Sequence, residues 1–288
     1  MLDDLVLSTR ANQHWLYNAI DSPDRCRDRG AFFKYSWPVS YNYNSRGFRD
    51  TEWPTSLNEL KQAIWCVGDS FTTGLGSALD RTWVHMLQQA TGRRCINISL
   101  EGASNGWIAR RARQILQEIQ PQHMVILWSY MHRRESPNAE LSDEQRRIPA
   151  YILDEAVDHV NYFEQCLRVL GTAHSTTVIS AVIPNDFADD LEPADQLWQV
   201  LADASWGSCP TTAAEFDALP QSIHSDLKKH KAHDYLRLCI RMTELHDNLQ
   251  PFIGTIPQQD QSRDGYHFDK LTSEWFVDKL IPCLNDTK

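Results

Sequence analysis

A serine in a predicted strand-to-helix turn is a candidate nucleophile. Ser70 lies in residues 68–74 (GDSFTTG), directly after a short apolar run. At such a turn the hydroxyl is exposed, and the backbone N–H of the same residue points into the same space. The residue can therefore attack a carbonyl and also donate to the oxyanion that forms. A serine that only caps a helix is the alternative.

A histidine near the other end of the chain could be the base that such a serine needs. His267 closes the sequence DGYH at residues 264–267, just before the last predicted helix. Near neutral pH a hydroxyl is a weak nucleophile, and histidine titrates in the range where a base is useful. A carboxylate such as Asp264 can hold the ring in one tautomer. We predict that both residues converge on Ser70; an ordinary histidine in a surface loop is the alternative.

Residues 102–105 (GASN) could complete the site, because they follow a second apolar run and open a predicted helix. Backbone N–H groups and amide side chains at such a place can donate to a developing oxyanion. We predict an oxyanion hole made by the N–H groups of Ser70 and Gly102 and the side chain of Asn105. A helix cap built by Ser104 or Asn105 is the alternative.

Short apolar runs separated by helical patterns would position these three motifs. The runs do not alternate cleanly with polar residues, which is typical of strands buried on both faces of a parallel sheet. Their alternation with helices favours an α/β sandwich, in which ligands bind beyond the carboxyl ends of the strands. Strands are predicted at residues 63–68, 95–99, 124–129, 177–183 and 251–255, and helices at residues 82–90, 104–119, 151–170, 235–249 and 273–284.

Three stretches fall outside this alternation. Residues 1–60 are expected to form an N-terminal extension that packs on a catalytic domain spanning residues 61–288. Insertions are expected at about residues 133–150 and 184–225, where long excursions at the active end of a sheet often shape a substrate pocket. In the extension, Arg46 and Arg49 could hold a substrate carboxylate, but a solvent-facing loop is the favoured interpretation.

Taken together, these motifs resemble the SGNH hydrolases, also called the GDSL family, over about residues 60–288. The GDS serine, the glycine after the second strand and the DxxH near the C-terminus occur in the order found in that family. The resemblance implies a flavodoxin-like, three-layer α/β/α sandwich around a five-stranded parallel sheet of order 2-1-3-4-5. It also implies Ser70 as nucleophile, Asp264 and His267 as its triad partners, and Gly102 as an oxyanion donor.

The chain departs from that family after the third strand. A G-x-N-D stretch there usually supplies an asparagine donor, whereas residues 128–133 read WSYMHR. Asn105 could replace the missing donor, and Ser129 or Tyr130 could contribute a hydroxyl or an N–H, so both are candidate substrate-binding residues. Loss of one oxyanion donor costs about 10²–10³ in rate. The GASN and WSxxxRxE patterns resemble a divergent branch of bacterial and phage-type proteins.

The function predicted from these residues is a serine esterase or deacetylase that forms an acyl-enzyme. A short acyl group, such as acetyl on a carbohydrate, is the expected substrate, because aromatic side chains are plentiful and suit stacking on sugar rings. An O-acyltransferase using the same triad and a non-catalytic carbohydrate-binding or structural protein are the alternatives. No cofactor or metal is expected: a helix face in solvent is favoured over a zinc site for the clustered histidines, namely His224, His230, His233 and His246.

Composition narrows the partners and the compartment. The formal net charge is −10, from 28 Lys and Arg against 38 Asp and Glu, which disfavours nucleic acid as a partner. Seven cysteines without a C-x-x-C indicate a reducing compartment. Since neither a signal-peptide pattern nor an 18-residue apolar run is visible, we expect a cytoplasmic protein without a membrane span. Association with a phage particle fits the branch that it resembles.

Overall fold

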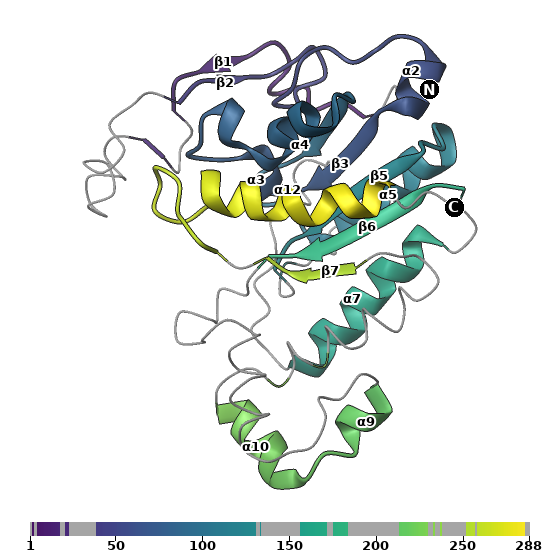
Figure 1. Ribbon diagram of the computed structural model, residues 1–288, viewed down its shortest axis with the longest axis vertical. Helices are drawn as coiled ribbons and strands as arrows, with labels where there is room; N and C mark the ends of the chain where they lie inside the picture. The colour runs from purple at the N-terminus through teal and green to yellow at the C-terminus, as the bar shows by residue number, and fades with distance from the viewer. Residues whose placement is uncertain are drawn as a thin grey trace.

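A sheet of five parallel strands forms the centre of the protein (Figure 1). The strands lie in the order β4-β3-β5-β6-β7. Their bounds are Ile64–Gly68 for β3, Cys95–Ser99 for β4, His123–Trp128 for β5, Thr177–Val182 for β6 and Phe252–Thr255 for β7. The computed structural model describes residues 2, 5–17, 21–22, 39–130, 133, 156–171, 175–183, 213–229, 233, 237, 252–256 and 258–285.

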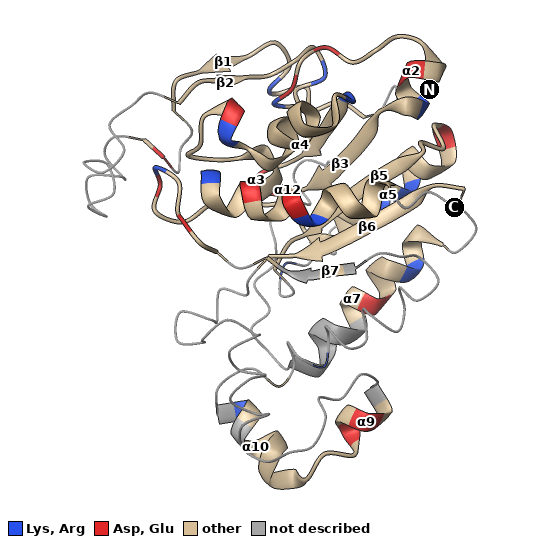
Figure 2. Cartoon of the chain, viewed as in Figure 1, with Lys and Arg blue, Asp and Glu red and all other residues tan. Residues whose placement is uncertain are grey.

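Helices cover both faces of the sheet, because alternate strand residues point to opposite sides and both sets are apolar. Trp65, Ile126 and Trp128 pack toward α5 (Asn105–Glu118) and α7 (Ala156–Leu170). Cys66, Val125 and Leu127 pack toward α4 (Trp83–Thr91) and α12 (Lys270–Asn285). In Figure 2 the residues coloured as Lys, Arg, Asp and Glu fall on helices and loops and none on the described strands of the sheet. The prediction of an α/β fold with a parallel sheet covered by helices is therefore confirmed.

The N-terminal residues add to the cover of the sheet. Leu2, Leu5, Leu7 and Phe48 are buried in the same core as α5. A short antiparallel pair, β1 (His14–Trp15) with β2 (Tyr41–Asn42), is drawn at the top of Figure 1, above α3 and α4. The remaining elements are α2 (Leu57–Gln62), α3 (Ser70–Thr73), the 3₁₀ helix η1 (Leu79–Arg81), α9 (Ala213–Asp217) and α10 (Gln221–Lys229).

Several sequence predictions fall on residues that the structure does not describe. The predicted helix at 235–249 and most of the expected insertions at 133–150 and 184–225 lie outside the described residues. The predicted division at residue 60 stays a prediction. Among the described helices, none has both the length and the apolar character needed to cross a membrane.

Candidate active site

The turn that presents Ser70 is built by its immediate neighbours. Asp69 caps α3 directly after β3, and its carboxylate accepts a hydrogen bond from Phe71 N at 3.0 Å. Gly68 is required beneath the turn, since a Cβ there would lie 2.1 Å from Thr72 Oγ1. The backbone N–H of Ser70 donates to no group in the described part of the chain. It is therefore free to donate to an oxyanion, and the predicted oxyanion hole stays a prediction.

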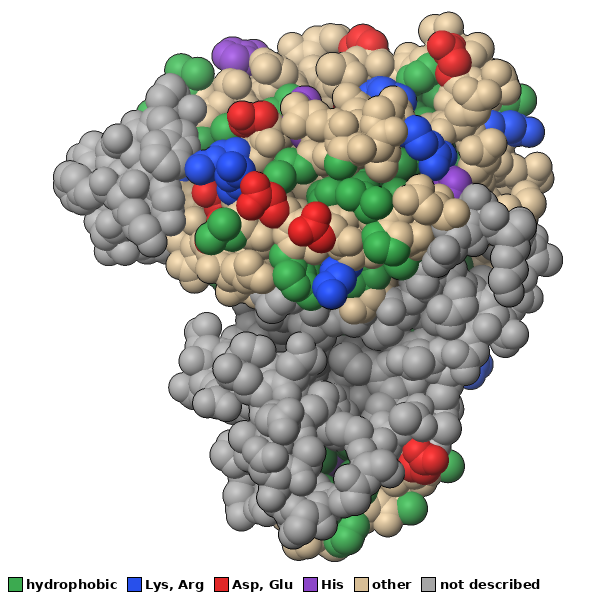
Figure 3. All heavy atoms as spheres, in the orientation of Figure 1, with side chains coloured by type: hydrophobic (Ala, Val, Ile, Leu, Met, Phe, Trp, Pro, Cys, Tyr) green, Lys and Arg blue, Asp and Glu red, His purple; other side chains and the backbone are tan. Residues whose placement is uncertain are grey.

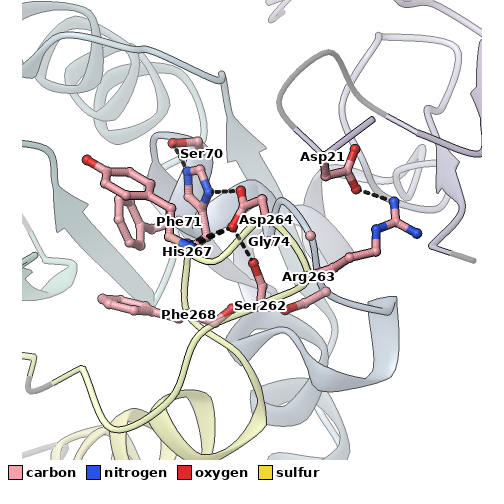
Figure 4. A network of polar contacts seen from close by, with 12 residues as sticks. Asp21, Ser70, Phe71, Gly74, Ser262, Arg263, Asp264, His267 and Phe268 are labelled. Atoms are coloured by element: carbon pink, nitrogen blue, oxygen red, sulfur yellow. Dashed lines mark hydrogen bonds and ion pairs between the residues drawn. The ribbon is translucent and has the colours of Figure 1, made fainter. Parts of the chain in front are cut away.

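The structure brings Ser70 together with His267 and Asp264 (Figure 4). His267 Nε2 lies 2.8 Å from Ser70 Oγ, and His267 Nδ1 lies 2.5 Å from Asp264 Oδ2. Both the serine and the histidine are 2% exposed, so a bound substrate would displace little water from them. With Nδ1–H directed at the carboxylate, Nε2 is left to accept the serine proton. This geometry is that of a nucleophile with an oriented base.

Asp264 is held in its charged form by the loop that precedes α12. Its Oδ1 atom accepts hydrogen bonds from Ser262 Oγ at 2.8 Å and from the backbone N–H groups of Tyr266 and His267. Burial alone would raise the pKa of Asp264, but the adjacent His267 and these hydrogen bonds outweigh it and lower the pKa to about 2. The group facing His267 is therefore a carboxylate at any pH near neutrality.

The two other predicted oxyanion donors are placed differently. Gly102 has φ of 74° in the turn after β4, and its N–H has no acceptor among the described residues. Asn105 is fully buried, and its Nδ2 atom donates to the carbonyls of Ser129 at 3.2 Å and Tyr130 at 3.1 Å. Each hydrogen of that amide thus has an acceptor, so the predicted role of Asn105 as an oxyanion donor has no support from its contacts.

A buried polar network occupies the place where the resemblance would put an asparagine. Ser129 Oγ donates to Asp69 Oδ2 at 2.5 Å, and Arg133 Nη1 donates to the same oxygen at 3.0 Å. Asn105 Oδ1 accepts from Ser129 N at 2.8 Å. The network ties the end of β5 to the cap of α3. Because its hydroxyl is engaged there, Ser129 gains no support as a substrate-binding residue.

Aromatic rings enclose the imidazole on the side of α12. The rings of Phe71 and His267 have centroids 4.6 Å apart, and Phe268 lies 4.5 Å from Phe71. The hydroxyls of Tyr130 and Tyr266 are hydrogen-bonded to each other beside this cluster. Tyr130 is 4% exposed, whereas Tyr266 is half-buried and is the more accessible of the pair.

The structure places the two arginines of the N-terminal part in different surroundings. A solvent-facing loop is wrong for Arg49, which is 2% exposed and donates to four backbone carbonyls. Arg46 donates to Leu2 O at 2.6 Å, and its guanidinium lies 4.7 Å from the Trp53 ring centroid. Arg133 of the polar network appeared in the sequence analysis only as the arginine of the WSxxxRxE pattern. Its contact with Asp69 was not predicted, because no local sequence signal joins the two residues.

The clustered histidines are only partly described. His224 Nδ1 lies 2.9 Å from His233 Nε2, and both rings pack against Phe216. His230 and His246 lie outside the described residues. The absence of a metal stays a prediction.

Around α12 and α4, side chains of both charge signs are scattered among apolar ones (Figure 3). The absence of a nucleic-acid partner also stays a prediction.

Comparison with known proteins finds solved structures but no family. No protein family and no curated protein matches the sequence. One similar structure is that of TesA, 15% identical over 78% of this chain and 98% of that one, with a TM-score of 0.44. Another is a GDSL-like lipase from Bacteroides thetaiotaomicron, 15% identical over 81% and 91% of the two chains, with a TM-score of 0.37. The psychrotrophic esterase EstA from Pseudoalteromonas is 12% identical over 77% and 96%, with a TM-score of 0.41. Such values decide neither activity nor substrate.

The network around Asp69 generates a stability prediction. Ser129→Ala removes one of the donors to a fully buried carboxylate. Because a hydrogen bond to a charged group contributes about 1.5–3 kcal/mol, the free energy of unfolding should fall by that amount. Urea denaturation followed by circular dichroism measures it. Ser225→Ala is the control, since in the described part of the chain its exposed hydroxyl bonds only to the carbonyl of Gln221. Equal effects of the two changes would refute the importance of the network.

Proposed function

We propose that this chain is an ester hydrolase of the SGNH type that works through a serine nucleophile. The observation on which this depends is the continuous chain of contacts from Ser70 Oγ through the His267 ring to the Asp264 carboxylate. A serine that merely capped a helix would need neither a base nor an oriented carboxylate. The Ser70 side chain also does not cap α3, because Asp69 fills that position.

Each step of the reaction then has a residue to perform it. Ser70 Oγ attacks the ester carbonyl while His267 Nε2 takes the hydroxyl proton, and the Ser70 and Gly102 N–H groups stabilise the oxyanion. Collapse of the tetrahedral intermediate breaks the ester bond, and His267 returns the proton to the departing alcohol. Water then attacks the acyl-enzyme with His267 again as base. This releases the acid and restores Ser70.

A short acyl group on a polar alcohol is the substrate class that we favour. Ser70 has little open surface around it, since the residue is 2% exposed and the buried rings of Tyr130 and Phe268 both pack against Phe71. Tyr266 is half-buried, and its ring can stack on a sugar ring. An acetylated carbohydrate fits both features. Product analysis with and without an acceptor sugar separates hydrolysis from acyl transfer by the same triad.

Turnover of p-nitrophenyl acetate tests the proposed function. Ser70→Ala and His267→Gln should each lower kcat by about 10⁴–10⁶, because nucleophile and base act as a unit. The two changes combined should cost little more than either alone. Acetate should be hydrolysed faster than octanoate if the acyl site is short.

His85→Gln is the matched control, because His85 lies on α4 and bonds only to Gln89 among its described hydrogen-bond partners. It should retain the wild-type kcat. Wild-type protein that releases no p-nitrophenol above the buffer rate, or a Ser70→Ala variant that retains full turnover, would rule out the proposed mechanism.

The pH profile of kcat/KM should report a single proton on its acid side. His267 must be neutral to accept the serine proton, so activity falls as the ring becomes protonated. The pKa of Asp264 is about 2, so its carboxylate stays charged and adds no second ionisation between pH 4 and 8. The logarithm of kcat/KM should therefore fall with a slope of about one. A slope of two, or a value of kcat/KM that does not change between pH 5 and 8, contradicts these roles.

A further inference from the structure

We propose that buried side chains of the N-terminal segment, meaning the described residues between 5 and 50, are positioning residues for the catalytic triad and the oxyanion turn. The inference rests on the proposed function and assigns to this segment a part in it. Three separate contacts support it, because each joins the segment to one of the three loops that hold the reacting groups. None of these side chains touches Ser70 or His267 in a described contact.

Arg49 is hydrogen-bonded to the turn that presents Ser70. Its Nη1 atom donates to the carbonyls of Thr73 at 3.0 Å and Gly74 at 2.5 Å. Its Nη2 atom donates to the carbonyls of Ser77 at 2.9 Å and Ser40 at 3.0 Å. The guanidinium is thus bonded to the end of α3 and to the chain beyond it. A planar, forked cation can bind several carbonyls at fixed angles, which a lysine ammonium does not reproduce.

Asp21 holds the loop that bears the other two triad residues. It forms a fully buried ion pair with Arg263, the residue before Asp264 (Figure 4). The Arg263 side chain points away from the triad toward Asp21, while its N–H donates to Gly76 O at 3.1 Å. The loop is therefore fixed on one side to the N-terminal segment and on the other to the chain that follows the Ser70 turn.

Tyr41 connects these two anchors. Its hydroxyl donates to Asp21 Oδ2 at 2.5 Å and accepts from Gly76 N at 2.8 Å. Its ring lies 4.3 Å from the Arg49 guanidinium, a cation–π contact. Burial and the nearby Asp21 carboxylate raise the pKa of Tyr41, so the phenol keeps the proton that it donates.

A third contact reaches the predicted oxyanion turn. Glu101, directly before Gly102, accepts a hydrogen bond from Tyr43 OH at 3.1 Å and forms an ion pair with Arg10. The Arg10 guanidinium also lies 5.7 Å from the Tyr43 ring. All three participants are buried. The position of the Gly102 N–H is thus set partly by side chains of the N-terminal segment.

Small displacements matter in such a site. A misplacement of about 1 Å between nucleophile, base and donors can cost about 10²-fold in rate. The Ser70 turn and the Asp264–His267 loop come from opposite ends of the catalytic region and pair through one imidazole. The N-terminal segment is bonded to both of these loops and therefore helps to fix the distance between them. A role in stability alone would not require its cations and its phenol to bond to these particular loops.

The mildest test is Tyr41→Phe, which keeps the ring against Arg49 and removes only the hydroxyl between Asp21 and Gly76. We expect kcat for p-nitrophenyl acetate to fall about tenfold or more, with KM within twofold, in protein that circular dichroism shows to be folded at the assay temperature. Arg49→Lys should lower kcat in the same way, since the charge remains but the fork is lost.

Two controls separate positioning from general damage. Tyr162→Phe makes the same chemical change on α7, and Glu52→Gln removes the charge from an exposed contact with Ser45 of the N-terminal segment. Both should keep the wild-type kcat. If Arg49→Lys does not fold, Tyr41→Phe alone decides.

The outcomes are distinguishable from a failure of the proposed function. A folded Tyr41→Phe variant with wild-type kcat overturns the positioning role while the hydrolase stands. Wild-type protein without Ser70-dependent turnover overturns both. A fall in kcat that is matched by Tyr162→Phe also counts against positioning, because the effect would then follow from loss of any phenol.

Discussion

The hydrogen bonds of one imidazole are the interaction on which the rest of this structure depends. His267 joins Ser70 to Asp264, although the serine and the histidine are 197 residues apart in the chain. The parallel sheet makes the contact possible, because β3 delivers Ser70 at its carboxyl end and α12 begins just beyond the Asp264–His267 loop. Burial of all three side chains strengthens their electrostatic coupling and makes an unpaired group costly.

Buried charge is the recurring means by which the site is held together. Asp69, Asp264 and Arg49 are almost fully buried, and each is bonded to several partners rather than to one. Such groups are expensive to bury unless their hydrogen bonds are satisfied. The contacts join the loops after β3 and β5 and hold the loop before α12, so these hydrogen bonds fix the positions of loops that carry no regular hydrogen-bond ladder of their own.

The strands, and the approach of His267 to Ser70, could be predicted from the sequence for a physical reason. Strands buried on both faces appear as continuous apolar runs. Ser70 directly follows such a run, and His267 directly precedes the last helix, so residue type and position pointed to both. The role of Arg49 was not accessible, because its neighbours Asn44, Ser45 and Gly47 predict a solvent-facing turn. Three of the four carbonyls that bind its guanidinium come from the distant residues 73–77. Asn105 shows the same limit: the sequence reveals an amide at a helix start but not that Ser129 and Tyr130 supply its acceptors.

Reaction with a fluorophosphonate reports directly whether Ser70 is activated, since the reagent phosphonylates a serine only when a base activates it. We expect one label per wild-type chain, located by peptide mass spectrometry at Ser70 and abolished when His267 is replaced by glutamine. A wild-type protein that takes up no label, or one labelled at another residue, would show that the imidazole between Ser70 and Asp264 does not activate the serine.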